Sequence, residues 1–476
     1  TNVAEGYQAA LQVVDDVILK NYITNLAEME IVPLDKSVLE SNIRDNVLFF
    51  KITEMVYEKN EFATYKFASV FNTLSSSDAA IFLILDSDGE KTDFYMGIRS
   101  LDSDRTTSSL RNTLENAMIG QFPGIKTQDY TVEEIEEIIG GIKGNSISAV
   151  SCVANSKEEN LNTNQEFVQG LEKLVLSMRG QRYTGIIIAN STNQMQLREL
   201  RRGYEMVYTQ LSPFASIQVN YGQNSSLVRT ESTSDAKTKS VSNTINESET
   251  ESITGTHGTS KENTTSKVIK GVAAVSSILG AALAPVTGGA SLAVGGVVSG
   301  GLGLLGTAVS GAVSDSESTN NSKTYGESTT VTDSDTHTIS VGTSATEGSS
   351  NAITLNIHDK SVEDMLTRIE KQLKRMDEFE SLGMYECAAY FLSEDQYAAE
   401  VAASTYKAIM RGENSGVEIA AINSWGSYER NKTELIEQYV KNFMHPIFRH
   451  SGALGEVEVS PCAMVSGNEL AIHMGM

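Results

Sequence analysis

The chain has few of the residues on which disulfide-stapled and metal-bound folds depend. Its three cysteines, Cys152, Cys387 and Cys462, lie far apart in a sequence of 476 residues, and the six histidines show no ligand spacing. This distribution excludes a disulfide framework and a Cys-x-x-Cys metal site, so we expect neither a metal nor a cofactor. The acidic, amphipathic opening of the chain is unlike a secretory signal peptide, which makes a reducing, cytoplasmic origin the default expectation.

Basic residues are also scarce. The chain carries 37 Lys and Arg against 61 Asp and Glu, a formal net charge of −24. A general nucleic-acid surface needs clustered cations for the phosphates, so nucleic acid is not expected as a general ligand, although a small basic site is still compatible with this charge. Arg198, Arg201 and Arg202 do cluster on one expected helix, where a solvated face or a salt bridge between subunits is the favoured interpretation.

Motifs that carry catalysis are missing as well. There is no GxxxxGK[ST] phosphate loop, no HExxH, no GxSxG and no GxGxxG after a strand, and the nearest approach, residues 140–146 (GGIKGNS), has the wrong order. The acidic turn at residues 86–90 does not have the spacing of a calcium loop. We therefore expect no enzyme within this chain and no catalytic residue.

What the sequence does contain is two ordinary globular flanks, residues 1–223 and 353–476. In the first, short apolar runs at 47–52, 79–85 and 184–189 predict strands, and the turn at residues 86–89 predicts a hairpin continuing at 92–98. Tyr7, Leu11, Val14 and Ile18 predict an N-terminal helix, and a helix from about 197 should stop at Ser212-Pro213.

The second flank shows the same mixture of predicted helices and strands. An amphipathic helix should begin at a capping box formed by Ser361 and Asp364, residues 387–392 should form a strand, and a further helix should end near Arg411. Strand–helix units in both flanks predict an α+β fold, a mixed α/β body into which the middle of the chain is inserted.

The middle of the chain alternates with a period of two. Between residues 230 and 260, 13 of 16 even positions are Ser or Thr against two of 15 odd positions, and between 314 and 350 the counts are 15 of 19 against four of 18. Such sorting predicts extended strands with two different faces. We therefore divide the insertion into an ascending arm (224–266), an apolar tip (267–314) and a descending arm (315–352).

The two arms together predict a long antiparallel hairpin, each arm spanning roughly 100 Å at about 3.3 Å per residue. A register in which residue numbers sum to about 584 places Ile253 opposite Val331 and Ile245 opposite Ile339. A lone ribbon of this kind is marginal in water and leaves two unpaired edges, so we expect hairpins from several subunits to close into a β-barrel tube. A disordered Ser/Thr-rich linker is the alternative.

The residues expected to form the tube are the hydroxyl side chains of the two arms. They are Ser240, Ser242, Thr244, Ser248, Thr250, Ser252, Thr254, Ser328, Thr330, Thr332, Ser334, Thr336, Thr338 and Ser340.

The apolar tip contains 44 uncharged residues, 271–314, rich in Gly and Ala. This length fits two membrane helices turning near residues 285–289, and a GxxxG at 296–300 would allow close helix contact. Strands through the bilayer and a Gly/Ala-packed soluble end of the tube are the alternatives. The residues expected to insert are Val272, Val275, Ile278, Leu279, Leu283, Leu292, Val294, Val297, Val298, Leu302, Leu304, Leu305 and Val309.

Two stretches of the body resemble a known family. Residues 174–214 contain RGQRYTGIIIA, LRRGYE and QLSPF, and residues 382–412 contain LGMYECAAYF and ASTYKAIMRG. They resemble the region ahead of the ATPase core in bacterial HerA/FtsK-like proteins, akin to the ATPases of conjugation and type IV secretion, some of which carry a similar Ser/Thr-rich insertion. Residues 460–476 look like the lead-in to such a core, whose nucleotide-binding motifs are not in this chain.

The resemblance implies a homo-oligomeric ring, commonly six-fold, and a role in moving macromolecules. Together with the tube it predicts a non-enzymatic membrane channel or pore component beside a translocation or secretion ATPase supplied in cis or in trans. Membrane lipid would be a partner, with the body on the cytoplasmic side of a bacterial membrane. A secreted β-hairpin pore-forming protein and a regulatory or assembly module of a translocation ATPase are the alternatives.

Overall fold

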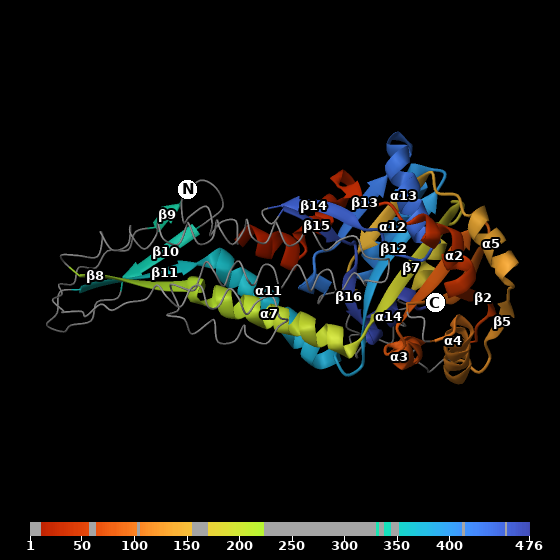
Figure 1. Cartoon of the computed structure of the whole chain (residues 1–476), viewed down its shortest axis with the longest axis horizontal. Coiled ribbons are helices and arrows are strands. Elements are labelled where there is room, and N and C mark those ends of the chain that lie inside the picture. Colours follow the sequence, from red (N-terminus) through yellow and green to blue (C-terminus); the bar gives the residue numbers. More distant parts are fainter. Residues whose placement is uncertain are drawn as a thin grey trace.

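The structure is a computed structural model, and it describes residues 11–56, 63–101, 105–154, 170–222, 330–332, 338–343, 352–411, 415–452 and 455–476. The described chain forms a wide body from which a long projection extends (Figure 1). We call this projection the stalk; it consists of residues 194–222 and the described residues between 330 and 379.

The body is built on one nine-stranded sheet in which every ladder is antiparallel. Its strands in spatial order are β13 (Ala421–Trp425), β6 (Ser146–Ser151), β12 (Met384–Ser393), β7 (Tyr183–Thr192), β3 (Ala79–Ser87), β4 (Thr92–Ser100), β2 (Val47–Glu54) and β5 (Lys126–Asp129). The ninth, β16 (Ala463–Ser466), pairs with β12 beside β6, so that β6 and β16 follow one another along the same edge of β12. The central strands are therefore supplied by both flanks of the chain.

Both faces of this sheet are covered. One face packs on α3 (Ala63–Leu74), α4 (Thr107–Gln121), α6 (Leu171–Ser177), α12 (Gln396–Met410) and α14 (Gly467–Met474). The other packs on the 3-10 helix η2 (Asn21–Glu28), α5 (Val132–Gly141) and α13 (Arg430–Lys441), with α2 (Lys36–Asn46) beside them. Because both faces are covered, β7 and β12 are buried along their whole length, although each also carries polar residues, among them Asn190 and Glu386.

A three-stranded sheet flanks the second face. It consists of β1 (Glu30–Ile31), β14 (Phe448–Gly452) and β15 (Gly455–Val459), all antiparallel.

The turn between β3 and β4 contains Gly89 at a φ of 100°, a left-handed conformation that glycine adopts without the steric cost of a Cβ.

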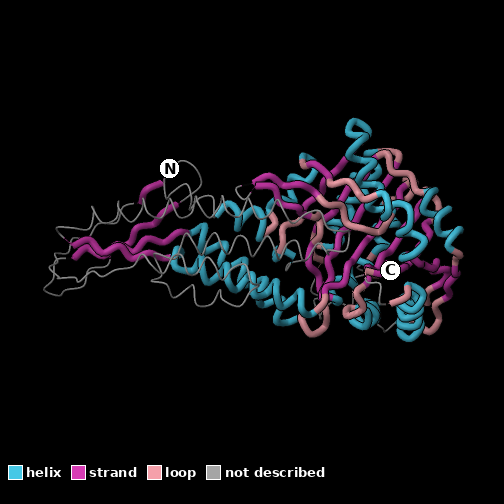
Figure 2. The backbone as a smooth tube through the Cα atoms, viewed as in Figure 1, coloured by secondary structure: helices cyan, strands magenta, loops and turns pink. Residues whose placement is uncertain are grey.

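The stalk grows directly out of the two central strands. The α7 helix (Gln194–Ala215) follows β7 after a single residue, and α11 (Lys360–Phe379) leads back into β12. The two helices lie side by side and continue into β8 (Ser216–Gly222) and β11 (Ala352–Asp359), which pair antiparallel (Figure 2). Beyond β11 come β10 (Thr338–Thr343) and β9 (Thr330–Thr332), giving the order β8-β11-β10-β9.

The mixed α/β body and the hairpin of β3 and β4 confirm the expectation from the sequence, which did not predict the large antiparallel sheet. Two helix ends differ. The α11 helix is capped by Asp359, whose carboxylate accepts from the backbone N–H groups of Ser361 and Val362, so the predicted Ser361 capping box is wrong. The α7 helix passes Pro213 and ends at Ala215, because Leu211 and Phe214 pack into the core of the stalk.

Within the insertion, Val331 pairs with Ile339, since β9 folds back on β10. The ascending arm, with the predicted partners Ile245 and Ile253, lies outside the described residues, so that register stays a prediction. A short local connection costs less loop-closure entropy than pairing across the whole insertion. A tube formed by several subunits remains a prediction.

The prediction of a transmembrane channel is contradicted by the character of the described helices. Within the ranges that the structure describes, none of the helices combines the length and the apolar character needed to cross a membrane. This finding contradicts the expected membrane-inserted pore or channel, so that prediction is wrong. The tip at 267–314, with all thirteen residues expected to insert, lies outside the described residues.

Candidate functional site

A row of residues crosses one face of the large sheet where the stalk begins. Strand register places Arg99 of β4 beside Ala80 of β3, Ala80 beside Asn190 of β7, Asn190 beside Glu386 of β12, and Glu386 beside Met464 of β16. Residues directly opposite each other on neighbouring strands point to the same face. Three buried polar side chains therefore share one level of an otherwise apolar face.

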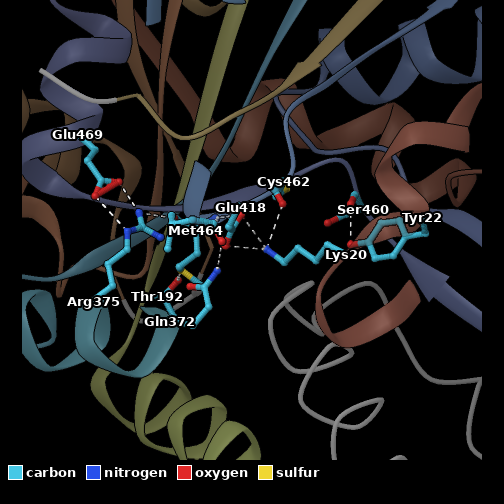
Figure 3. A network of polar contacts seen from close by, with 11 residues as sticks. Lys20, Tyr22, Thr192, Gln372, Arg375, Glu418, Ser460, Cys462, Met464 and Glu469 are labelled. Atoms are coloured by element: carbon cyan, nitrogen blue, oxygen red, sulfur yellow. Dashed lines mark hydrogen bonds and ion pairs between the residues drawn. The ribbon is translucent and has the colours of Figure 1, made fainter. Parts of the chain in front are cut away.

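This level separates two apolar clusters. On one side of Glu386, Ala388 and Tyr390 belong to the core of the body, and on the other side Met384 belongs to the core of the stalk. The residues of β12 thus pass from one cluster to the other through a polar position. We call the buried polar groups at this boundary the ionic layer; they are Lys20, Arg375, Glu386, Glu418 and Glu469 with their partners. Figure 3 shows the four of these residues that form ion pairs, Lys20 with Glu418 and Arg375 with Glu469.

Lys20 and Glu418 form the first ion pair of the layer. Lys20 Nζ lies 3.3 Å from Glu418 Oε1, and the two side chains are 12% and 3% exposed. Lys20 Nζ also donates to the carbonyl of Cys462 at 3.3 Å, and Glu418 Oε2 accepts from the backbone N–H of Met464 at 3.2 Å. Burial is the largest single influence and by itself would lower the pKa of Lys20, but Glu418, Tyr22, Tyr204 and Glu386 together more than offset it, so the pKa is raised and the ammonium stays charged.

Arg375 and Glu469 form the second pair. Arg375 on α11 donates through Nε to Glu469 Oε1 at 3.2 Å, and its Nη2 donates to the carbonyl of Met464 at 2.6 Å. Its Nη1 has no hydrogen-bond partner within the described part of the chain. Burial raises the pKa of Glu469, and Arg375 opposes that shift. Both pairs converge on Met464, which lies at the start of the short β16 strand.

Neutral hydrogen bonds extend the layer to either side. Gln372, one turn before Arg375, donates to the carbonyl of Val417 at 3.1 Å, and the Tyr22 hydroxyl donates to the carbonyl of Ser460 at 3.1 Å. The α11 helix and the N-terminal segment therefore hold the same two segments, 417–418 and 460–469, from opposite sides, as Figure 3 shows.

The far end of the row is also buried. Arg99 donates through Nε to the carbonyl of Phe443 at 2.9 Å, and burial lowers its pKa to about 10. Beside it, His445 donates through Nε2 to the carbonyl of Glu386 at 3.1 Å and accepts at Nδ1 from the Tyr390 hydroxyl at 2.7 Å. Burial lowers the pKa of His445 to about 3, so the imidazole is neutral at physiological pH.

Burial holds two cysteines and one histidine of the core in their neutral forms. Burial raises the pKa of the Cys152 thiol to about 12 and that of Cys462 well above its usual range, which removes the thiolate that nucleophilic attack requires. His473 has both ring nitrogens engaged, by Ala154 N–H and the Tyr406 hydroxyl, and burial lowers its pKa to about 3. In the residues that can be searched, no cluster of three or more His, Cys, Asp and Glu could hold a metal ion.

The residues singled out from the sequence are placed elsewhere. Thr330 and Thr332 lie on β9, Thr338 and Ser340 on β10, and the other predicted tube residues are outside the described ranges. Arg198 and Arg201 pair with Glu380 beyond the end of α11, so these two arginines belong to intramolecular salt bridges.

The residues of the ionic layer were not predicted from the sequence, although the pattern of one helix indicated that two polar residues are buried. Gln372 and Arg375 recur at the spacing of the buried stripe of α11, where Ile369 and Met376 are apolar neighbours. Polar residues on the inner face of an amphipathic helix mark a buried polar contact. Lys20 and Glu418 gave no comparable signal.

Comparison of the chain with protein-family models, with curated proteins and with solved structures finds no match. The body, the stalk and the ionic layer between them are therefore the basis for assigning a function.

Proposed function

We propose that this chain is a non-catalytic assembly or regulatory module of a translocation ATPase, in which the stalk holds a contact element at a fixed distance and direction from the body. The observation that carries this proposal is the continuity of stalk and sheet. The two stalk helices are extensions of β7 and β12, neighbouring strands at the centre of the body.

A spacer must keep its direction, and the base of the stalk is built for that. One residue, Asn193, separates β7 from α7, and the ionic layer ties α11 to α14 through Arg375 and Glu469. A buried ion pair contributes little net stability but enforces one geometry, because any other arrangement leaves a charge unpaired in an apolar environment. This favours a positioning role over turnover of a substrate.

The resemblance to HerA/FtsK-like proteins supplies the class of partner. The stretches that carry it include β7 with most of α7, and β12 with α12; the stalk grows out of β7 and β12. The partner would be the ATPase core of such a protein, in cis or in trans, and copies of this chain would assemble with it as a ring. The net charge of −24 argues against nucleic acid as the ligand of the body surface.

The test is reconstitution with a HerA/FtsK-type ATPase core from the same organism. We expect a complex at micromolar concentration in size-exclusion chromatography with light scattering, and a several-fold change in ATP turnover by the core when the chain is added. A matched variant in which residues 223–351 are replaced by Asn-Gly keeps the body and the helical part of the stalk. It should lose the effect on turnover if the contact element lies in the insertion.

Two results would overturn the proposal. The first is ATP hydrolysis or other turnover by the isolated chain, which would make it an enzyme. The second is the absence of both complex formation and any change in turnover.

A further inference from the structure

The N-terminal segment, residues 11–28, crosses the ionic layer from the stalk to the body, and we propose that it is a latch that opens as a unit and so controls the attachment of the stalk. We call this segment the strap. The inference concerns a conformational device within the chain and is independent of the proposed partner.

The strap joins the two apolar clusters that the ionic layer separates. Val14 and Ile18 are buried in the core of the stalk with α7 and α11, whereas Ile23 and Leu26 are buried in the core of the body. Between them Lys20 inserts its ammonium into the ionic layer (Figure 3). One short segment therefore contacts stalk, layer and body in turn, and its departure would remove contacts with all three.

Polar contacts follow the same division. On the stalk side Arg368 of α11 pairs with Asp15 at 3.1 Å. On the body side Asn423 of β13 donates to the carbonyl of Ile23 at 2.7 Å, and Lys432 of α13 donates to the carbonyl of Ala27 at 3.0 Å. The strap also packs against β13, the strand at the end of the large sheet.

The backbone of the strap departs from regular helix at the point where it crosses the layer. Residues 14–18 form a π-helical turn closed by a hydrogen bond from Leu19 N–H to the carbonyl of Val14 at 2.9 Å. The next residue, Lys20, is left-handed, with φ 58° and ψ 34°, although it carries a Cβ. Such conformations persist only where the surroundings impose them, and they concentrate in switch regions and functional sites.

The strap ends at a natural hinge. Immediately after it, β1 is fixed by pairing with β14, and Val32 N–H donates to the carbonyl of Ile447 at 2.9 Å. The segment before β1 can therefore move while the rest of the body stays paired. The ammonium of Lys20, at this left-handed turn, is held by Glu418 and by the carbonyl of Cys462, and the ion pair with Glu418 is the latch.

Amide hydrogen exchange on the full chain tests this directly. In the wild type we expect the amides of the strap to exchange faster than those of β7 and β12, because the strap opens without global unfolding. Lys20→Met should accelerate exchange in the strap by about a hundredfold, since it leaves Glu418 unpaired, and should leave β7 and β12 unchanged. Arg44→Met, which breaks the exposed pair between Arg44 on α2 and Glu136 on α5, is the matched control and should change nothing in the strap.

A second pair of variants separates the latch from general destabilisation. Glu418→Gln keeps an acceptor for Met464 N–H but leaves Lys20 unpaired, so it should loosen the strap as Lys20→Met does. Combining Lys20→Met with Glu418→Gln removes both charges and should return exchange in the strap toward the wild-type rate. Failure of the double variant to recover would mean that the pair is not the latch.

Freedom of the stalk is measured with spin labels on Thr209→Cys in α7 and Leu176→Cys in α6, two exposed positions in a chain whose native cysteines are all buried. We expect one narrow distance in the wild type and a broad distribution with Lys20→Met. The proposal is overturned if strap and sheet amides exchange at the same rate in the wild type, a result that needs no variant to fold. It is also overturned if the distance distribution does not respond to Lys20→Met.

Discussion

Gly222 and Ala352 are Cα partners at the outer end of the ladder between β8 and β11. The chain between them therefore leaves the stalk and returns to it at adjacent positions. The two described strands of that segment, β9 and β10, pair with each other and with β11, and none of the ladders of the body includes them. The body and the helical part of the stalk are thus complete without residues 223–351.

Excision of residues 223–351 should leave a folded protein. An Asn-Gly dipeptide joining Gly222 to Ala352 forms the two-residue turn that suits an antiparallel pair, so we expect a cooperative thermal transition within about 4 °C of the wild type. Circular dichroism melts measure this. Closing the same excision with a longer Gly/Ser linker is the control and should be slightly less stable because of its loop entropy. Loss of the cooperative transition would show that the insertion is part of the core.

Gly383 is the position between stalk and body that tolerates a side chain least. It has a φ of 93° in the connection from α11 to β12, and a Cβ there would overlap the side chain of Ser75. Gly383→Ala should lower the free energy of unfolding by about 2–4 kcal/mol, the combined cost of a left-handed alanine and of overpacking. Urea denaturation measures this loss.

The double variant Gly383→Ala with Ser75→Gly divides the two causes. It relieves the overlap but leaves the backbone strain, so it should recover part of the loss. If Gly383→Ala alone is neutral, the connection between α11 and β12 is looser than the geometry indicates, and the stalk is not held at that point.

Elements that depend on a local sequence pattern could be predicted from the sequence. Contacts between residues far apart in the chain could not. The runs at 79–85 and 184–189 became β3 and β7 because continuous apolar segments between turn signals have few alternatives to a buried strand. Lys20 and Glu418 meet across 398 positions of sequence, and each alone is indistinguishable from a surface charge. Arg375 lay on the inner stripe of its helix, which indicated burial but not the partner, because a partner is set by tertiary packing.

Acid should destabilise the protein through its buried histidines. The pKa of His445 is about 3 in the folded protein, lowered first by burial and further by Arg99, against an ordinary value near 6.5. A lowered folded pKa means that the unfolded chain binds the proton more tightly. The contribution is fully present above about pH 6.5 and is lost as the pH falls toward 3. At pH 5 the stability lost amounts to about 2 kcal/mol for one histidine.

His445→Gln tests that assignment. Glutamine can keep the donation to the Glu386 carbonyl but does not titrate, so the loss of stability between pH 7 and pH 5 should be about 2 kcal/mol smaller than in the wild type. Urea denaturation at the two pH values gives the difference. An equal loss in both proteins would mean that His445 takes up its proton in the fold or that other groups dominate.

The last prediction concerns the cost of breaking the ionic layer from the side of the stalk. Arg375 and Glu469 are 8% and 13% exposed, so Glu469→Gln leaves a guanidinium buried without its counter-charge. We expect that variant to lose about 3–5 kcal/mol in urea denaturation. Arg375→Met combined with Glu469→Gln should lose less than Glu469→Gln alone, because the remaining cost is the unpaired carbonyl of Met464, about 1–3 kcal/mol.

Arg201, which pairs at the surface with Asp377, is the matched control: Arg201→Met should cost less than about 1 kcal/mol. If Glu469→Gln is as mild as Arg201→Met, water reaches the layer, its charges do not enforce one geometry, and the stalk must be positioned by the apolar packing of α7 and α11 alone.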